Sequence, residues 1–292
     1  MVAMLTRRAL LAALPALPAL AARKRSALII DGQNNHAWAA TTPLLKRYLE
    51  QTGLFTVSVS TTPPKGGDMQ TYRPKFSAHD VVVLNYNGED WSKETEADFV
   101  KYVASGKGLV VVHAANNAFP TWPEFNEMIG LGGWGNRTEK SGPYLRLREG
   151  KWVTDTQPGR GGSHGDQHEY VVTVRDPKHP ITKGLPPEWL HAKDELYDRL
   201  RGPAKNVHIL ASAFAPKAKR GSDENEPLIM VLPYGKGRVF HTCLGHGVEA
   251  MSSVDFIVTY QRGTEWATTG KVTQKLPADF PGKDKVSLRQ AK

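Results

Sequence analysis

The stretch that decides the fold is Gly108-Leu-Val-Val-Val112, which is followed at once by His113. Four apolar residues in a row, three of them valine, predict a strand that is buried on both faces. Similar apolar runs occur earlier in the chain, at residues 26–31 and 80–84. Strands that are covered on both faces need helices on either side of their sheet, so the pattern indicates an α/β protein.

The segments between these runs carry the signals of helices. Pro43 fits the first turn of a helix that Gly53 stops. Ser92 is a suitable N-cap for a second helix. With a further strand at residues 55–60, the order is strand, helix, strand, strand, helix, strand. This order is typical of an open, mainly parallel sheet with helices on both faces.

The second half of the chain continues with strands and closes with a helix. We expect strands at residues 170–174, 207–213, 228–232 and 238–242, a hairpin turn at 233–237 and a helix at 256–266. Residues 130–168 are rich in glycine and have no regular pattern. They predict an inserted loop that covers the functional site.

The composition suits one large globular domain or two small ones. The chain has 292 residues, of which 40% are hydrophobic, and this length is sufficient to bury a sizeable core. Cys243 is the only cysteine, so no internal disulfide can form. The net charge is +9, but the basic residues are scattered and are not interleaved with aromatic residues. This distribution argues against a nucleic-acid partner.

The N-terminus has the pattern of a secretory signal. Arg7 and Arg8 precede a short apolar run, and Ala19-Leu-Ala21 places small residues around a cleavage point. The paired arginines favour the twin-arginine route and a periplasmic or secreted protein, with an uncleaved lipid-side anchor as the alternative. The run is short and broken by prolines, so we expect no stable membrane insertion. The predicted parts are a signal peptide at 1–21, one domain at 22–270 and a loose, polar C-terminal extension at 271–292.

Ligands of open parallel sheets bind outside the carboxyl ends of the strands, where three polar loops should meet. These loops are residues 32–36, 85–90 and 113–117. His113 is the strongest candidate because it follows a buried strand directly, while Asn35 and His36 follow the first strand. Asn116 and Asn117 are side chains of the kind that bind sugar hydroxyls. No G-x-G-x-x-G follows the first strand, so we expect no nucleotide cofactor.

Polar residues in the second half complete the candidate site. Residues 161–169 are dense in metal-binding residue types but match no recognised zinc pattern, so a flexible polar lid and a metal site both stay open. Asp194 and Glu195 are adjacent, and on a strand only one of them can face the site, with Tyr197 on the side of Glu195. His246 lies between two glycines at a strand end, where the backbone can approach a ligand closely.

Together these motifs resemble the ThuA-like family of trehalose-utilisation proteins. The matching stretches occur in the family's order and cover about residues 26–270. They are Gly106–His113 with the Ala-Ala-Asn-Asn that follows, His179-Pro-Ile-Thr-Lys-Gly184, Asp194-Glu-Leu-Tyr197, Gly237–His246 and Trp266-Ala267. The resemblance implies a flavodoxin-like fold, similar to that of class I glutamine amidotransferases, and a role in sugar catabolism. Those enzymes carry a nucleophilic cysteine after a buried strand, whereas this chain has Val112-His113-Ala114 there.

The resemblance and the residues together predict an enzyme that acts on a glycoside or keto-sugar by isomerisation or cleavage and is not an amidotransferase. His113 and His246 would transfer protons, because imidazole titrates near neutral pH, with Glu195 or Asp194 as partner. A divalent metal, zinc first among them, would be held by His36, His113 and His246 and would polarise a carbonyl. The expected substrate-binding residues are Asn35, Asn116, Asn117, Trp122 and Tyr197.

Two alternatives remain open at this level. The first is a non-catalytic carbohydrate-binding protein, with Trp38, Trp91, Trp122 and Trp134 stacking on sugar rings. The second is a metal-dependent hydrolase that acts on another class of substrate. In every case the partner is a small molecule, and a homo-oligomer is compatible with the sequence.

Overall fold

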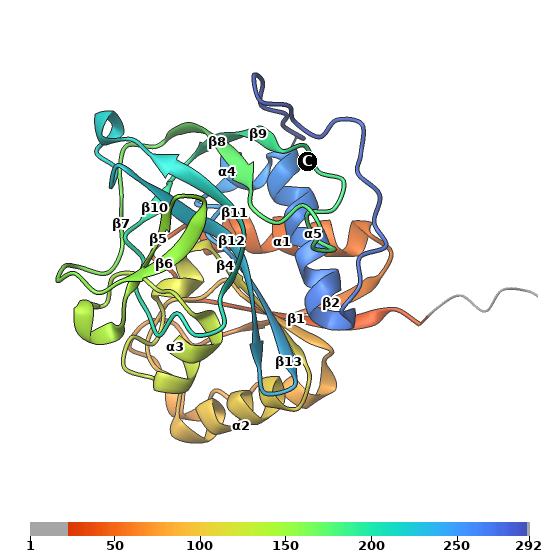
Figure 1. Cartoon of the computed structure of the whole chain (residues 1–292). Helices are drawn as coiled ribbons and strands as arrows, with labels where there is room; N and C mark the ends of the chain where they lie inside the picture. The colour runs from red at the N-terminus through yellow and green to blue at the C-terminus, as the bar shows by residue number, and fades with distance from the viewer. Residues whose placement is uncertain (1–22, 291–292) are drawn as a thin grey trace, which may run out of the picture.

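The computed structural model describes residues 23–290 and confirms the α/β class (Figure 1). One nine-stranded sheet has the order β2-β1-β3-β4-β13-β12-β11-β8-β9. Within the described residues, no helix is both long and apolar enough to cross a membrane. The predicted signal peptide at residues 1–21 lies outside this part of the chain.

One half of the sheet is parallel and carries the apolar runs of the sequence. In it, β1 (Arg25–Asp31) pairs with β2 (Phe55–Thr61) and β3 (Val81–Leu84), and β4 (Gly108–Val112) pairs with β3 and β13 (Gly237–Thr242). Both β3 and β4 are buried at every position, as their continuous apolar sequences predict. Because these strands all run the same way, their carboxyl ends share one edge of the sheet.

The other half of the sheet is antiparallel. From β13 it continues through β12 (Glu224–Tyr234), β11 (His208–Ala215), β8 (His168–Val174) and β9 (Glu188–Asp194). The predicted hairpin turn reverses the chain between β12 and β13. The sequence does not predict β9, because charged and apolar residues are mixed along it without a regular period.

Helices cover both faces of the sheet, as predicted. On one face, α1 (Trp38–Gln51) packs on β1 and β2, and α5 (Val254–Thr269) packs on β4 and β13. On the other face, α2 (Lys93–Ala104) and α3 (Pro123–Ile129) pack on β13 and β12. A single-turn helix, α4 (Val248–Met251), joins the site edge to α5.

The first helix starts earlier than the sequence predicts. It begins at Trp38, so Pro43 lies in its second turn and not its first. The missing N–H of Pro43 leaves the carbonyl of Ala39 without a helical bond, but Ala39 is exposed and water can satisfy it. The second helix agrees with the prediction, because the Ser92 side chain caps it by accepting a hydrogen bond from the Thr95 N–H at 3.3 Å.

The inserted residues 130–168 contain more regular structure than predicted. A hairpin of β5 (Tyr144–Arg148) and β6 (Lys151–Asp155) stands beside the sheet, and β7 (Ser163–His164) pairs with β10 (Tyr197–Asp198). This second pairing fixes one end of the insertion beside the residues that follow β9. Short 3-10 helices lie at Met69–Thr71 (η1), Phe76–Ala78 (η2), His113–Asn117 (η3), Glu139–Ser141 (η4) and Lys217–Lys219 (η5).

The C-terminal segment packs on the domain and is not the loose extension that the sequence predicts. The Gly282 carbonyl accepts a hydrogen bond from the Leu190 N–H of the edge strand β9 at 2.8 Å. Phe280 packs on Trp189, with ring centroids 5.4 Å apart. Figure 1 shows this segment running back past α5 to β9. It covers part of an edge strand that would otherwise present unpaired backbone groups.

Removal of residues 271–292 should therefore destabilise the domain. We expect a loss of roughly 2–4 kcal/mol in the free energy of unfolding, from the exposure of Trp189 and the loss of the bonds to β9. Urea unfolding followed by circular dichroism measures it. A chain truncated after Arg289 keeps these contacts and should match the full-length protein. Equal stability of the two truncated chains would contradict the attachment.

Candidate functional site

Four histidines surround the carboxylate of Glu195. The Nε2 atoms of His36 and His113 lie 3.5 and 3.6 Å from its Oε2. The Nε2 atoms of His164 and His246 lie 3.6 and 3.3 Å from its Oε1. One carboxylate thus meets four imidazoles that are far apart in the sequence.

The position of each residue follows from the sheet. His36 comes after β1, His113 directly after β4 and His246 after β13, so all three lie where parallel strands end. Glu195 follows β9, and His164 is the last residue of β7. The carboxyl edge of the sheet, where ligands of such folds bind, is therefore where the histidines predicted from the sequence come together.

Hydrogen bonds at Nδ1 orient three of the rings. His113 Nδ1 donates to the Cys243 carbonyl at 2.7 Å. His36 Nδ1 lies 3.2 Å from Asn34 Oδ1, an oxygen that also accepts from the His36 backbone N–H at 2.9 Å. His164 Nδ1 likewise lies 2.9 Å from a backbone carbonyl oxygen. A carbonyl oxygen only accepts, so in the neutral rings Nδ1 carries the proton and each Nε2 turns a lone pair toward Glu195.

This arrangement fits a bound cation. Lone pairs that face an anion are repelled unless a positive charge lies between them. The ligand atoms of His36, His113 and Glu195 lie within 4.8 Å of one another, and His113 Nε2 is buried without a hydrogen-bond partner among the described residues. Two imidazoles and a carboxylate form a donor set of catalytic zinc sites, and the Nδ1 bonds are the outer contacts that orient such ligands.

His246 is oriented differently from the other three rings. Its Nδ1 lies 3.4 Å from Gln167 Nε2, an amide nitrogen that can only donate and that also donates to Glu195 Oε1 at 3.3 Å. The proton of neutral His246 is therefore on Nε2, directed at the carboxylate. Burial lowers the pKa of His246, and the charge of Glu195 only partly offsets this, so the ring is neutral at pH 7. Its orientation favours proton transfer over the metal ligation expected from the sequence.

Glu195 is an anion at neutral pH. Burial by itself raises its pKa, but the close rings of His113 and His36, and the positive charge of His113 and His246 when they are protonated, outweigh burial and hold the pKa well below the usual range. The carboxylate therefore attracts positive charge into the centre of the histidine cluster. A bound cation can supply that charge as well as protonated imidazole can.

Asp194 faces away from the cavity and positions the site. Its Oδ1 accepts from the backbone N–H groups of Glu195 at 2.8 Å and His246 at 3.0 Å. Its Oδ2 accepts from the Gly245 N–H at 2.8 Å. The sequence leaves open which of the two neighbouring acids faces the site, and the structure places Glu195 there.

A buried histidine holds Asp194 in turn. His191 Nε2 lies 3.0 Å from Asp194 Oδ2, and His191 Nδ1 lies 2.7 Å from Asp255 Oδ2, with no part of the three side chains exposed. Burial lowers the pKa of His191, but the two carboxylates raise it further, to about 10, so the ring is a cation at neutral pH. Asp255 lies in the first turn of α5, where the helix dipole favours negative charge.

The backbone of His113 is strained. Its φ of +45° lies in the left-handed region that residues other than glycine rarely adopt. Its ring lies against Tyr197, with ring centroids 4.1 Å apart. Strain of this kind is concentrated at functional positions, where the surrounding structure imposes a conformation that displays the side chain.

A cavity of about 430 Å³ opens beside the cluster. Three of the predicted substrate-binding residues line it, namely Asn35, Asn117 and Tyr197. Asn116 does not, because it is fully buried and its Nδ2 lies 3.0 Å from a buried histidine ring. Trp122 does not either, since it is buried in a cluster of aromatic side chains. The structure therefore places two of the five predicted substrate-binding residues away from the cavity.

The sequence assigns no definite role in the site to His164, Gln167 or Asn87, yet all three belong to it. His164 and Gln167 come from the inserted segment, and Asn87 comes from the loop after β3. In the sequence, the only pattern that points to His164 is the density of metal-binding residue types at residues 161–169. Trp134, expected to stack on sugars only if the protein does not catalyse, also lines the cavity.

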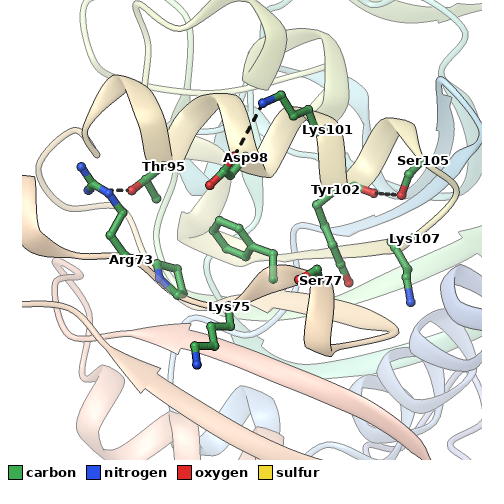
Figure 2. A pocket seen from close by; sticks show the side chains of 11 residues that line it. Arg73, Lys75, Ser77, Thr95, Asp98, Lys101, Tyr102, Ser105 and Lys107 are labelled. Carbon is green, nitrogen blue, oxygen red and sulfur yellow. Dashed lines mark hydrogen bonds and ion pairs between the residues drawn. The ribbon is translucent and has the colours of Figure 1, made fainter.

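A larger cavity, of about 600 Å³, lies between α2 and residues 73–77 of the segment that joins β2 to β3 (Figure 2). No histidine lines it, and two of the cations on its wall, Arg73 and Lys101, have acidic partners. Arg73 lies 3.2 Å from Glu94, and Lys101 lies 3.8 Å from Asp98. Among the residues that the structure describes, the one group of side chains placed to hold a metal ion includes His36 and Glu195 of the smaller cavity, so that cavity is the candidate site.

Asp194 and Glu195 should respond differently to substitution. Asp194→Ala removes the acceptor of the N–H groups of Glu195, Gly245 and His246, and we expect it to lower the free energy of unfolding by roughly 3–5 kcal/mol. Glu195→Ala removes a side chain that faces a cavity and should change it by less than about 1 kcal/mol. Urea unfolding of both variants tests the contrast. Similar losses in the two would contradict the positioning role of Asp194.

The chain is similar to known proteins over most of its length. A family model described as trehalose utilisation (ThuA) matches residues 26–267. A ThuA-like protein from Parabacteroides merdae ATCC 43184 is 49% identical, with a TM-score of 0.90 over 91% of this chain and 98% of that one. No curated protein matches the chain.

Two more distant structures share the fold alone. A ThuA-like protein from Bacteroides uniformis ATCC 8492 is 20% identical, with a TM-score of 0.58 over 88% of this chain and 98% of that one. A cytoplasmic protein from Salmonella typhimurium LT2 is 12% identical, with a TM-score of 0.52 over 84% of this chain and 100% of that one. The matched family residues include the whole histidine cluster and Glu195, and the chain belongs to the ThuA family of trehalose-utilisation proteins.

Proposed function

We propose that the protein is an exported enzyme of carbohydrate catabolism that acts on a glycoside or keto-sugar by isomerisation or cleavage. The observation that carries the proposal is the convergence of four imidazoles on Glu195 at the ligand-binding edge of the sheet. Family membership supports a sugar as the substrate. The cavity of about 430 Å³ has a size suited to a small molecule.

We assign His36, His113 and Glu195 as ligands of a divalent cation, with zinc favoured by the donor set. When bound, such an ion polarises a carbonyl or hydroxyl oxygen of the substrate. The chain itself supplies orientation. The Nδ1 hydrogen bonds fix the two rings, and the hydrogen bond that the Glu195 N–H donates to Asp194 fixes the backbone of Glu195.

His164 and His246 are assigned to proton transfer. Neutral His246 carries its proton on Nε2, while neutral His164 has a free lone pair there. Their side chains are 36% and 32% exposed, so a substrate can reach both. One group that can give a proton and one that can take it are what an isomerisation or a cleavage requires.

The wall of the cavity supplies contacts for the rest of the sugar. Asn35 and Asn117 carry amides that can bind hydroxyl groups as donor or acceptor. The Asn117 Oδ1 atom is buried and has no hydrogen-bond partner among residues 23–290, so it is free to accept one. Tyr197 and Trp134 form an aromatic wall, with ring centroids 4.7 Å apart.

The metal assignment predicts about one divalent ion per chain in purified protein, measured by elemental analysis. His36→Ala, His113→Ala and Glu195→Gln should each weaken metal binding by more than about 100-fold, because outer contacts alone are worth 10- to 100-fold. His208→Ala removes an exposed histidine that pairs with Asp176 and should keep the metal. Full metal content in all three site variants would overturn the assignment.

The proton-transfer assignment predicts that His164→Gln and His246→Gln lower kcat by about 100- to 10,000-fold while the metal stays bound. Turnover is measured by NMR on a panel of glycosides and keto-sugars, with His208→Gln as the control. Sugar binding without product anywhere on the panel would favour the carbohydrate-binding alternative. Metal-dependent turnover confined to esters or amides would favour a hydrolase of another class, and either result contradicts the proposal.

A further inference from the structure

The cavity at Glu195 adjoins a second cavity across Trp134. The second cavity has a volume of about 450 Å³ and is lined by residues 134–137 and 160–164, so the two share Trp134, Gly135 and His164. We propose that this outer cavity is a second sugar subsite and that the substrate is a two-ring glycoside whose linkage crosses Trp134. The inference rests on the proposed function and specifies the substrate class of the same site.

Trp134 is held in a conformation that displays its ring at the boundary. Its φ is +53°, and Gly135 and Asn136 follow with φ of +57° and +60°. A tryptophan in the left-handed region is strained, and such strain persists only where neighbouring contacts impose it. The half-buried indole lies 6.0 Å from the His164 ring, measured between centroids. A flat aromatic surface at this point can pack against the apolar face of a sugar ring.

Arg137 locks this loop. Its side chain is almost fully buried, and Nη1 donates to the Gly133 carbonyl at 2.7 Å. Nη2 donates to the Ala118 carbonyl at 2.8 Å and to Asn126 Oδ1 at 2.9 Å. Burial lowers the pKa of Arg137 to about 10, which still leaves a cation at neutral pH. The loop that carries Trp134 is thus preorganised, which reduces the entropy lost when a ligand binds.

The outer cavity also offers free polar groups. Asn136 and Arg160 line it and are exposed, and their side chains make no hydrogen bond within residues 23–290. The Ser163 hydroxyl, in contrast, is already bonded to Asp198. An amide and a guanidinium beside an aromatic ring provide hydrogen bonds and apolar contact together, which is what a sugar ring needs.

The contents of the two cavities decide which ring lies where. His36, Glu195 and the hydroxyl-binding amide of Asn117 line only the inner one, whereas the outer one shares just His164 with the cluster. The reacting ring therefore occupies the inner cavity. The second ring occupies the outer cavity and contributes binding without reaching the ligand atoms of His36 and Glu195.

The test compares a two-ring ligand with a one-ring ligand by isothermal titration calorimetry on the zinc-loaded protein. The probes are trehalose, methyl α-D-glucopyranoside and a keto derivative of each of these two sugars. The Asn136→Ala/Arg160→Ala double variant alters only the outer cavity and should bind the two-ring probe about tenfold more weakly, with one-ring binding unchanged. Trp134→Ala should weaken both probes, and Trp134→Phe should recover part of the loss.

Lys151→Ala, on the β5–β6 hairpin, is the matched control and should bind both probes like the wild type. Circular dichroism confirms that each variant is folded. If the double variant binds the two-ring probe as tightly as the wild type does, the outer subsite is wrong and the proposed function stands. If no probe binds the wild type, the sugar assignment fails and the subsite fails with it.

Discussion

The carboxylate of Asp194 accepts hydrogen bonds from the N–H groups of Glu195, Gly245 and His246, which belong to two loops far apart in the sequence. A fully buried carboxylate destabilises the folded protein unless a positive charge pairs with it. His191 provides the pair, and it is shared with Asp255 at the start of α5. A chain of charges thus runs from a helix N-terminus to the site backbone, and the position of Glu195 depends on it.

Asp194 and Glu195 are adjacent, yet they use the same functional group in opposite ways. The charge of Asp194 is met by backbone donors and a fixed cation, so it contributes to the fold. The charge of Glu195 meets the Nε2 atoms of His36, His113 and His164, which carry lone pairs in their neutral form. A carboxylate that faces lone pairs lowers the stability of the folded protein and raises its affinity for a cation. Functional sites commonly have such a cost in stability.

The sequence predicts the parts of this site that follow from strand direction. Parallel strands end at one edge, so residues after them must meet there, which holds for His36, His113 and His246. Local rules do not decide between Asn116 and Asn117, because both lie in one 3-10 turn and only tertiary packing turns one of them inward. His164 is placed by a two-residue strand pairing with Tyr197, too short to leave a periodic pattern in the sequence.

The strained position after β4 is where the resemblance to class I amidotransferases implies a nucleophile. His113 occupies it, and Cys243 cannot take over that role. Burial raises the pKa of the Cys243 thiol far above its usual range, so no thiolate forms at neutral pH. The carbonyl of Cys243 accepts the His113 Nδ1 proton instead and turns the Nε2 lone pair toward Glu195. Because the backbone of residue 243 makes that contact, the orientation of the His113 ring does not depend on the Cys243 side chain, which is buried in the core.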